Sequence, residues 1–270
     1  MLLPPFLVFA AGVFLYFETE HEVRAQFDRA RQEWRTGHYR EAARLYDSVY
    51  RHYPASGYGA RALWELGTIH YVNWYQIDRA LEDFQRLIEE YPGSPLVTPA
   101  YLRLAEIHAI GFQDLPQAIR YWKVLLTRRL PQDLRHQVLF KTGTALFKLG
   151  HFEEARQTLE QLVARRPEDH LAQEARLRIG TILQLGRQYR QSLNFFLPVL
   201  HNTTCSECRL QAQLGLIEDY EFLNDLPRAI EYAKAIHNKD YPFEMKQELL
   251  ARLQKKRRYY EPRLWKGRKR

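Results

Sequence analysis

Small residues recur along this chain every 37 or 38 positions, and no other property of the sequence limits the possible folds as strongly. In five of the six repeats a large apolar residue follows the small one after four positions, which is one helical turn. Another small residue precedes it by 12 to 14 positions. Because one helix pair cannot bury its apolar face alone, this period predicts a stack of helix pairs. The recurring small residues are Ala42, Ala80, Ala118, Ala155, Ser192 and Ala229.

Each repeat is expected to hold two antiparallel helices that approach closely at the small residues. The predicted first helices lie near residues 23–36, 58–74, 96–110, 134–149, 171–186 and 206–223. A proline closes the second helix of five repeats, as is common just beyond a helix end; these are Pro54, Pro92, Pro131, Pro167 and Pro242. Thr204 takes that place in repeat 5. After the last repeat an apolar stripe, formed by Met245, Leu249, Leu250 and Leu253, predicts a capping helix over 243–260.

The order of small residue, aromatic, Ala, aromatic and Pro over residues 23–242 resembles the tetratricopeptide repeat. Repeat 4 follows the pattern most closely, through Leu139, Thr142, Gly143, Gly150, Phe152, Ala155, Leu159, Leu162 and Pro167. The resemblance implies an all-α, right-handed solenoid of about six helix-turn-helix repeats, preceded by one N-terminal hydrophobic helix. The phrases Tyr-Pro-Ala-Ser at 53–56 and Tyr-Pro-Gly-Ser at 91–94 are similar to BamD-like and Tol-Pal-associated proteins of the Gram-negative envelope. That narrower resemblance implies an envelope scaffold.

The N-terminal residues Leu2 to Phe17 are uncharged and almost wholly apolar. We interpret residues 1–22 as an uncleaved signal-anchor or transmembrane segment, although Pro4 and Pro5 shorten its usable helix. A cleaved signal peptide and a buried N-terminal helix are the alternatives. Together with the envelope resemblance, this predicts a single-pass protein of the bacterial inner membrane with its repeats in the periplasm. The 27% of charged residues exclude a polytopic membrane protein.

The net charge of +8 comes from the C-terminal tail alone. One acid, Glu261, accompanies nine basic residues there: Lys255, Lys256, Arg257, Arg258, Arg263, Lys266, Arg268, Lys269 and Arg270. The composition of this tail, with Tyr259, Tyr260 and Trp265 between the cations, suits anionic lipid, nucleic acid or an acidic protein. A solvated, disordered basic tail over 261–270 is the alternative.

No motif of an enzyme is present in the sequence: a Walker loop, GxGxxG, HExxH and GxSxG are all missing. We therefore predict a protein without enzymatic activity, cofactor, metal or small-molecule substrate. The two cysteines, Cys205 and Cys208, exclude a disulfide-stapled scaffold. Their CxxC spacing predicts a possible local disulfide or two free thiols, and His201 leaves open a three-ligand zinc site.

In the resembled family the first helices line a concave face that binds partner segments. Twelve residues are predicted to point into this groove: Arg24, Phe27, Arg31, Trp34, Arg35, Arg61, Trp64, Tyr71, Phe140, Phe147, Lys148 and Tyr220. Aromatic anchors and arginines suit an extended or helical partner that carries carboxylates. The alternative is that the apolar positions form core between neighbouring helices. Among these residues Trp34, Tyr71 and Arg61 are the strongest predictions.

The sequence thus predicts a membrane-anchored scaffold without enzymatic activity, which assembles a bacterial cell-envelope complex by holding protein partners in its groove. The alternative is a cytoplasm-facing, membrane-tethered adaptor whose basic tail binds anionic lipid or nucleic acid. The two differ in the side of the membrane on which the repeats lie.

Overall fold

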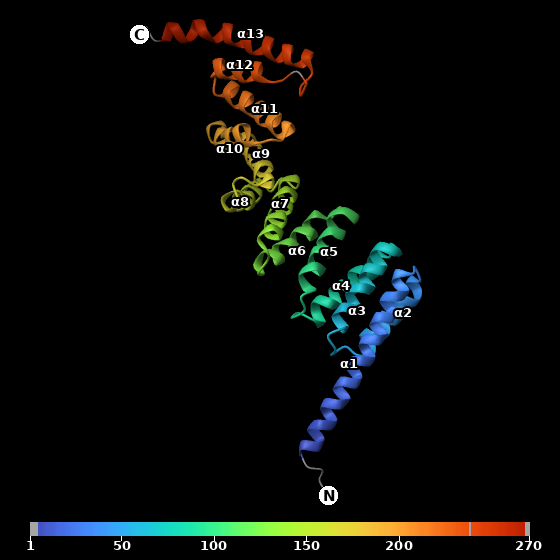
Figure 1. The fold of residues 1–270 in the computed structure, drawn as a ribbon. Coiled ribbons are helices and arrows are strands. Elements are labelled where there is room, and N and C mark those ends of the chain that lie inside the picture. The colour runs from blue at the N-terminus through green and yellow to red at the C-terminus, as the bar shows by residue number, and fades with distance from the viewer. Residues whose placement is uncertain (1–4, 238, 268–270) are drawn as a thin grey trace. The chain divides into compact units, whose positions relative to one another are not determined.

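The computed structural model describes the backbone of residues 5–237 and 239–267, and the side chains of residues 20–237 and 239–260. Every regular element in these ranges is a helix, as predicted (Figure 1). The chain divides into two compact units, Met1–Leu125 and Leu126–Arg270. We call them the N-terminal and the C-terminal unit and describe each by itself.

The N-terminal unit contains the first three repeats. Its helices are α1 (Pro5–Arg35), α2 (Tyr39–His52), α3 (Gly59–Thr68), α4 (Ile77–Glu90), α5 (Val97–Glu106) and α6 (Leu115–Thr127). The last two residues of α6 lie past the boundary between the two units. Short π-helical turns, η1 (Ile69–Asn73) and η2 (Ile107–Gly111), extend α3 and α5. The apolar core between the helices is rich in aromatic rings, with Phe27, Tyr46 and Phe84 almost fully buried.

The C-terminal unit contains repeats 4 to 6 and the cap. Its helices are α7 (Gln132–Lys148), α8 (Phe152–Arg165), α9 (His170–Leu185), α10 (Tyr189–Asn202), α11 (Ser206–Phe222), α12 (Leu226–Ala235) and α13 (Phe243–Gly267). Leu253 of α13 is buried against the core of repeat 6. Glu221 accepts hydrogen bonds from Arg252 (2.8 Å) and Lys256 (3.2 Å). The capping helix is confirmed, and it continues past the predicted end at residue 260.

The close approach of helices at small residues is confirmed in repeats 2, 4 and 5. A Cβ added to Gly67 would lie 2.7 Å from the Phe84 ring, and one added to Gly180 would lie 2.5 Å from the Phe196 ring. The equivalent contact of Gly143 is made with Leu159. Gly215 differs from the expectation, because it faces Phe196 of the preceding repeat and not its own second helix.

The turn inside each repeat contains one residue with a positive φ, and these residues follow the same period as the sequence. They are Gly37, Tyr75, Gln113, Gly150, Arg187 and Asn224. A left-handed residue ends a helix by redirecting the chain, so its recurrence explains why every first helix stops at an equivalent point. Only two of the six are glycines, and the other four hold a conformation that costs a side chain about 1 kcal/mol or more.

The π-helical turns explain the longer period of the first repeats. From Gly67 to Tyr75, and from Ala105 to Gln113, the chain has one residue more than from Gly143 to Gly150. A π turn accommodates one extra residue without ending the helix. In η1 and η2 the amides of Trp74 and Phe112 bond to the carbonyls of Ile69 and Ile107, five residues earlier.

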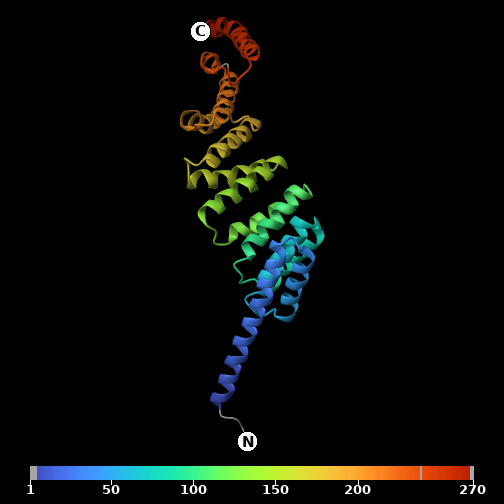
Figure 2. The same cartoon turned by 45° about the vertical axis from the view of Figure 1, so that its right-hand side comes forward.

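The predicted membrane span is wrong for the part of the chain that the structure describes. No described helix is long and apolar enough to cross a membrane. Instead α1 is one continuous helix that joins the apolar segment to the first repeat, so the predicted boundary at residue 22 lies inside it (Figure 2). Within the described residues the apolar run is short, because an 18-residue stretch that begins at Pro5 already contains Glu18, Glu20 and Glu22. The localisation as a single-pass inner-membrane protein is corrected accordingly.

Candidate partner-binding surface

The predicted groove residues of the N-terminal unit lie on α1, α3 and η1. Arg24, Arg31, Trp34, Arg35 and Arg61 are among them, and Trp34 is 38% exposed. Exposure of an arginine is ordinary, and Trp34 leaves enough of its ring in water for a partner to contact it. These positions therefore remain available to a partner.

Phe27 corrects the prediction, because it belongs to the core. Its side chain is 2% exposed and its ring packs against Tyr46, with 5.1 Å between ring centroids, and against Tyr58 at 5.2 Å. Arg61 covers the ring from outside, with its guanidinium carbon 4.8 Å from the Phe27 centroid. The apolar stripe thus serves here as core, and Arg61 supplies the exposed face above it.

Three arginines gather on the same surface above repeat 1. Arg31 and Arg35 come from α1 and Arg61 comes from α3, and all three positive charges act on the buried hydroxyl of Tyr46. Burial nevertheless raises the pKa of the Tyr46 hydroxyl, with Glu65 adding to that effect. None of the three arginines has a carboxylate oxygen within 4.0 Å among the described residues. The surface therefore presents positive charge that no close ion pair neutralises.

Glu65 is an acidic residue close enough to Arg61 and Arg31 for their charges to affect its pKa. Burial raises the pKa of its carboxyl, and the charges of Arg61 and Arg31 oppose this shift. With one half-buried carboxylate beside three exposed guanidinium groups, the surface is basic on balance. We call Arg31, Arg35, Arg61 and Trp34 the basic face of the N-terminal unit.

Two more aromatic residues predicted for the groove pack against the next core cluster of the N-terminal unit. Trp64 of α3 is half-buried against Phe84, with ring centroids 5.3 Å apart. Tyr71 of η1 is also half-buried and lies under the guanidinium of Arg103 at 5.5 Å. Arg103 in turn donates to Glu106 at 2.8 Å. These rings are fixed by their neighbours and keep one side accessible.

The remaining predicted groove residues belong to the C-terminal unit. Phe140 is half-buried under Arg178 at 4.8 Å, Phe147 packs against the ring of Phe152 at 5.6 Å, and Lys148 is exposed. Tyr220 is a second correction, since it is only 6% exposed and stacks on Tyr232. No basic face like that of the N-terminal unit forms from these residues.

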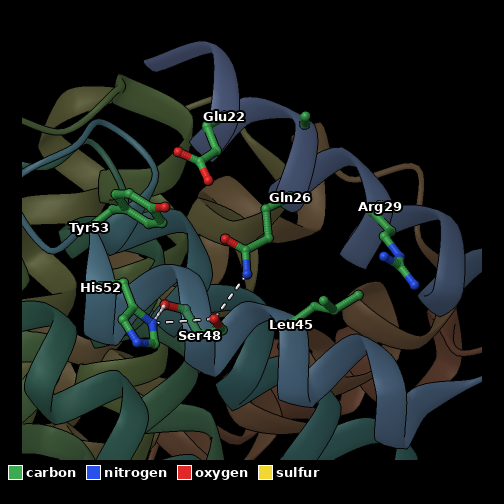
Figure 3. A pocket seen from close by; sticks show the side chains of 8 residues that line it. Glu22, Gln26, Arg29, Leu45, Ser48, His52 and Tyr53 are labelled. Carbon is green, nitrogen blue, oxygen red and sulfur yellow. Dashed lines mark hydrogen bonds between the residues drawn. The ribbon is translucent and has the colours of Figure 1, made fainter. Parts of the chain in front are cut away.

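A hollow between α1 and α2, which the sequence did not indicate, has a volume of about 540 Å³ (Figure 3). Gln26 donates through Nε2 to Ser48 Oγ at 2.9 Å, and His52 Nδ1 lies 2.9 Å from the carbonyl of Ser48. Glu22 and Arg29 stand at its rim on α1. The spacing of Glu22, Gln26 and Arg29 by about one helical turn would have shown that this side of α1 faces water, but not that a hollow forms there.

Four exposed apolar residues at the π turns also escaped the sequence analysis. Tyr75 is 80% and Ile110 70% exposed, and Val72 and Phe112 are about half exposed. The extra residue of repeats 2 and 3 was visible in the sequence, but its effect on the turn was not.

The basic tail begins within α13. Lys255, Arg257 and Arg258 are exposed, and Lys256 is half-buried beside Glu221. The backbone remains helical to Gly267, which differs from a disordered tail after residue 260. The side chains of Arg263 and Lys266, and residues 268–270 altogether, lie outside the described part. Binding of lipid or nucleic acid by this tail stays a prediction.

Cys205 and Cys208 are free thiols in the structure. Cys205 is the N-cap of α11, and its Sγ accepts a hydrogen bond from the backbone amide of Cys208 at 3.2 Å. No group of three or more His, Cys, Asp or Glu that could hold a metal ion occurs among the described residues. The pair thus lies in one helical turn with each sulfur near the other.

Comparison with known proteins supports the repeat assignment. Models of the tetratricopeptide repeat match residues 27–95 and 137–169. A search of curated proteins gave no match. The narrower resemblance to BamD-like and Tol-Pal-associated proteins is not confirmed by these findings.

Solved structures agree on the fold. The C-terminal part of a tetratricopeptide-repeat protein from Cytophaga hutchinsonii is 13% identical with a TM-score of 0.64, covering 89% of this chain and 94% of that one. YrrB, described as having an unusual peptide-binding site, is 16% identical with a TM-score of 0.57, covering 79% and 99%. A protein from Parabacteroides merdae is 14% identical with a TM-score of 0.52, covering 87% and 92%.

Proposed function

This chain contains tetratricopeptide repeats, and we propose that it is a protein-interaction scaffold whose basic face binds an acidic segment of a partner protein. Tetratricopeptide-repeat proteins act as interaction scaffolds, and the matching family models are not those of an enzyme. The peptide-binding site named for YrrB is in keeping with a solenoid that holds a peptide.

The observation that carries the proposal is the meeting of Arg31, Arg35 and Arg61 from two helices without a close carboxylate partner among the described residues. Like charges held together on a folded surface repel each other, and a partner's carboxylates relieve this repulsion. A guanidinium group also binds a carboxylate through two parallel hydrogen bonds, which fixes the orientation of the bound chain. The geometry therefore favours Asp and Glu in the partner.

Aromatic rings on α1, α3 and η1, the segments that carry or extend from the basic face, suggest that the partner also needs an apolar side chain. Trp34 is exposed on α1, and Trp64 and Tyr71 are half-buried on α3 and η1. Tryptophan and tyrosine supply much contact area for little lost conformational freedom, and they dominate the energy of many interfaces. We expect the partner segment to place an apolar side chain among its carboxylates.

Selection of random peptides by the full chain tests the proposal. We expect the selected peptides to be enriched in Asp and Glu next to an aromatic or branched apolar residue. Their affinity should fall at least about tenfold in Arg31→Glu/Arg61→Glu, since truncating or reversing a central interface arginine commonly costs about 1.4 kcal/mol or more. Fluorescence anisotropy with one labelled selected peptide measures this change.

Arg79→Glu is the matched control, because Arg79 is an exposed arginine on the second helix α4. It should keep the affinity of the wild type. Selection of basic or charge-free peptides, or equal binding by the two variants, would refute the basic face as the binding site.

A further inference from the structure

The N-terminus of α11 contains a second feature with chemistry of its own. Cys205 occupies the N-cap position and is exposed, while Cys208 follows one helical turn later. The chain has no other cysteine. Any disulfide formed within one molecule must therefore join these two residues.

The local geometry already holds the sulfur of Cys205 against the first turn of the helix. Its Sγ accepts the amide hydrogen of Cys208 at 3.2 Å, and the backbone of Cys205 is extended, with φ −76° and ψ 116°. An N-cap side chain in this arrangement points back over the third helical residue. The third helical residue is Cys208 itself, and its thiol is close enough to act on the Cys205 thiol through a side-chain hydrogen bond.

We propose that Cys205 and Cys208 form a reversible dithiol–disulfide pair that exchanges with small-molecule disulfides. The thiolate sulfur of Cys205 attacks one sulfur of the external disulfide, and the S–S bond of that molecule breaks to release one thiol. Cys208 then gives up its proton and attacks the Cys205 sulfur, which releases the second thiol. Two protein thiols are thus oxidised by two electrons, and the external disulfide is reduced to two thiols.

Exposure and hydrogen bonding determine which cysteine attacks the external disulfide and which one resolves the mixed disulfide. Hydrogen bonds from the side chain and backbone of Cys208 lower the pKa of the Cys205 thiol. Burial raises the pKa of the Cys208 thiol to about 11, and the neighbouring Cys205 adds to that shift. Because the exposed thiol also has the lower pKa, Cys205 is the attacking and Cys208 the resolving residue.

The position of the pair gives its oxidation a structural consequence. The closing proline is missing at this joint, and Thr203 connects the helices instead: its hydroxyl accepts from the Cys205 amide at 3.2 Å and its carbonyl from Arg209 at 2.8 Å. A disulfide would close the first turn of α11 covalently next to these bonds. We therefore expect slower amide hydrogen exchange at the start of α11 in the oxidised chain.

Equilibration of the full chain with glutathione redox buffers tests the proposal. Intact mass after alkylation should show two free thiols in the reduced chain and none in the oxidised chain, with no glutathione attached. In Cys208→Ser a mixed disulfide between Cys205 and glutathione should accumulate, because the resolving thiol is gone. Iodoacetamide should react faster with Cys205 in Cys208→Ser than with Cys208 in Cys205→Ser.

A wild-type chain that retains glutathione on either cysteine, that forms a disulfide between two molecules, or that keeps both thiols under oxidising buffer would overturn the proposal. Equal alkylation rates of the two single variants would remove the assigned roles. Circular dichroism of both variants shows whether the helices persist, so that a loss of folding is not taken for a loss of chemistry.

Discussion

The two units bury different chemistry in the joints between their helices. In the N-terminal unit one buried polar residue among the described side chains, Asp83, accompanies a core of aromatic rings. In the C-terminal unit the buried polar residues among the described side chains are His136, Thr142, Gln173, Ser192, Thr203, Gln213 and Asp219. Among the described side chains, the C-terminal joints therefore bury more polar groups than the N-terminal joints, where Asp83 is paired with His70.

The clearest polar joint links repeats 5 and 6. Asp219 is fully buried and accepts hydrogen bonds from Ser192 and from Gln184, the latter at 2.9 Å. Ser192 occupies the recurring small position, where the other five repeats have Ala. Its hydroxyl is the group that donates to Asp219. In the N-terminal unit the comparable place in repeat 2 holds Ala80, which is buried in an apolar cluster with Phe84.

The largest expected effect concerns Phe196, which both neighbouring helices enclose. Gly180→Ala would place a Cβ 2.5 Å from its ring, and Gly215 confines the ring from the other side at 2.6 Å. We expect a loss of about 1 to 3 kcal/mol in the free energy of unfolding, as overpacked cores show. Gly67→Ala, against Phe84 in the N-terminal unit, should lose less. Urea unfolding followed by circular dichroism measures both.

Gly57→Ala is the control for these substitutions, since nothing lies within 4 Å of an added Cβ at Gly57. It should change the free energy of unfolding by no more than about 0.5 kcal/mol. If Gly180→Ala changes the free energy of unfolding as little as this control does, the close contact between Gly180 and the Phe196 ring is contradicted.

The second effect is a gain of stability in Asp219→Asn above neutral pH. Burial raises the pKa of the Asp219 carboxyl to about 6, although Ser192 and Gln184 oppose the shift. The folded chain then binds a proton that the unfolded chain has already lost, so its stability falls as pH rises between about 4 and about 6. The amide introduced by Asp219→Asn cannot ionise, and the variant should be more stable at pH 8 by on the order of 1 kcal/mol.

Thermal unfolding of the wild type and Asp219→Asn between pH 4 and pH 8 checks this prediction. The two curves should approach each other toward pH 4, where the folded carboxyl is protonated and the unfolded carboxyl begins to take up its proton. Asp78→Asn, at an exposed position in the N-terminal unit, should leave the pH profile unchanged. If the wild type gains more stability than Asp219→Asn as the pH rises from 4 to 8, the raised pKa of the buried Asp219 carboxyl is contradicted.

The smallest effects belong to the turns. Gly150→Ala should lose about 1 kcal/mol, because its φ of 78° disfavours a side chain although nothing lies within 4 Å. Tyr75→Gly should gain less than about 1 kcal/mol, because relief of strain is partly offset by greater freedom of the unfolded chain. Urea unfolding measures the change in the free energy of unfolding for each variant. A loss in Gly150→Ala together with a gain in Tyr75→Gly would show that backbone conformation, and not side-chain contact, determines the turn. Changes of the same sign would argue against this.

Much of the fold could be predicted from the sequence because it depends on period. The six predicted first helices end within a few residues of the structure, since small residues and prolines mark where helices meet and stop. The Tyr-Pro phrases also have a local role, because the Tyr91 hydroxyl donates to the carbonyl of Pro54 at 2.9 Å and joins repeats 1 and 2. Such a link depends on packing between repeats, which no single repeat encodes.

The candidate site was less predictable for a related reason. The period identifies which residues share a helix face, but it does not show how deep each one lies. Phe27 and Tyr220 occupy face positions and are buried, whereas Trp34 on the same face stays exposed. The gathering of Arg31 and Arg61 depends on how α1 and α3 pack. The N-terminal segment and the first repeat share the one helix α1, although the change from apolar to polar residues near Glu18 suggested a boundary.

The basic face is the central claim, and a charge exchange tests it most directly. A labelled acidic peptide selected by the wild type should bind Arg31→Glu/Arg61→Glu at least about tenfold more weakly. The same peptide with its carboxylates changed to lysines should bind this variant better than it binds the wild type. If the lysine peptide binds both chains alike, the arginines do not contact the partner, and the proposed site is wrong.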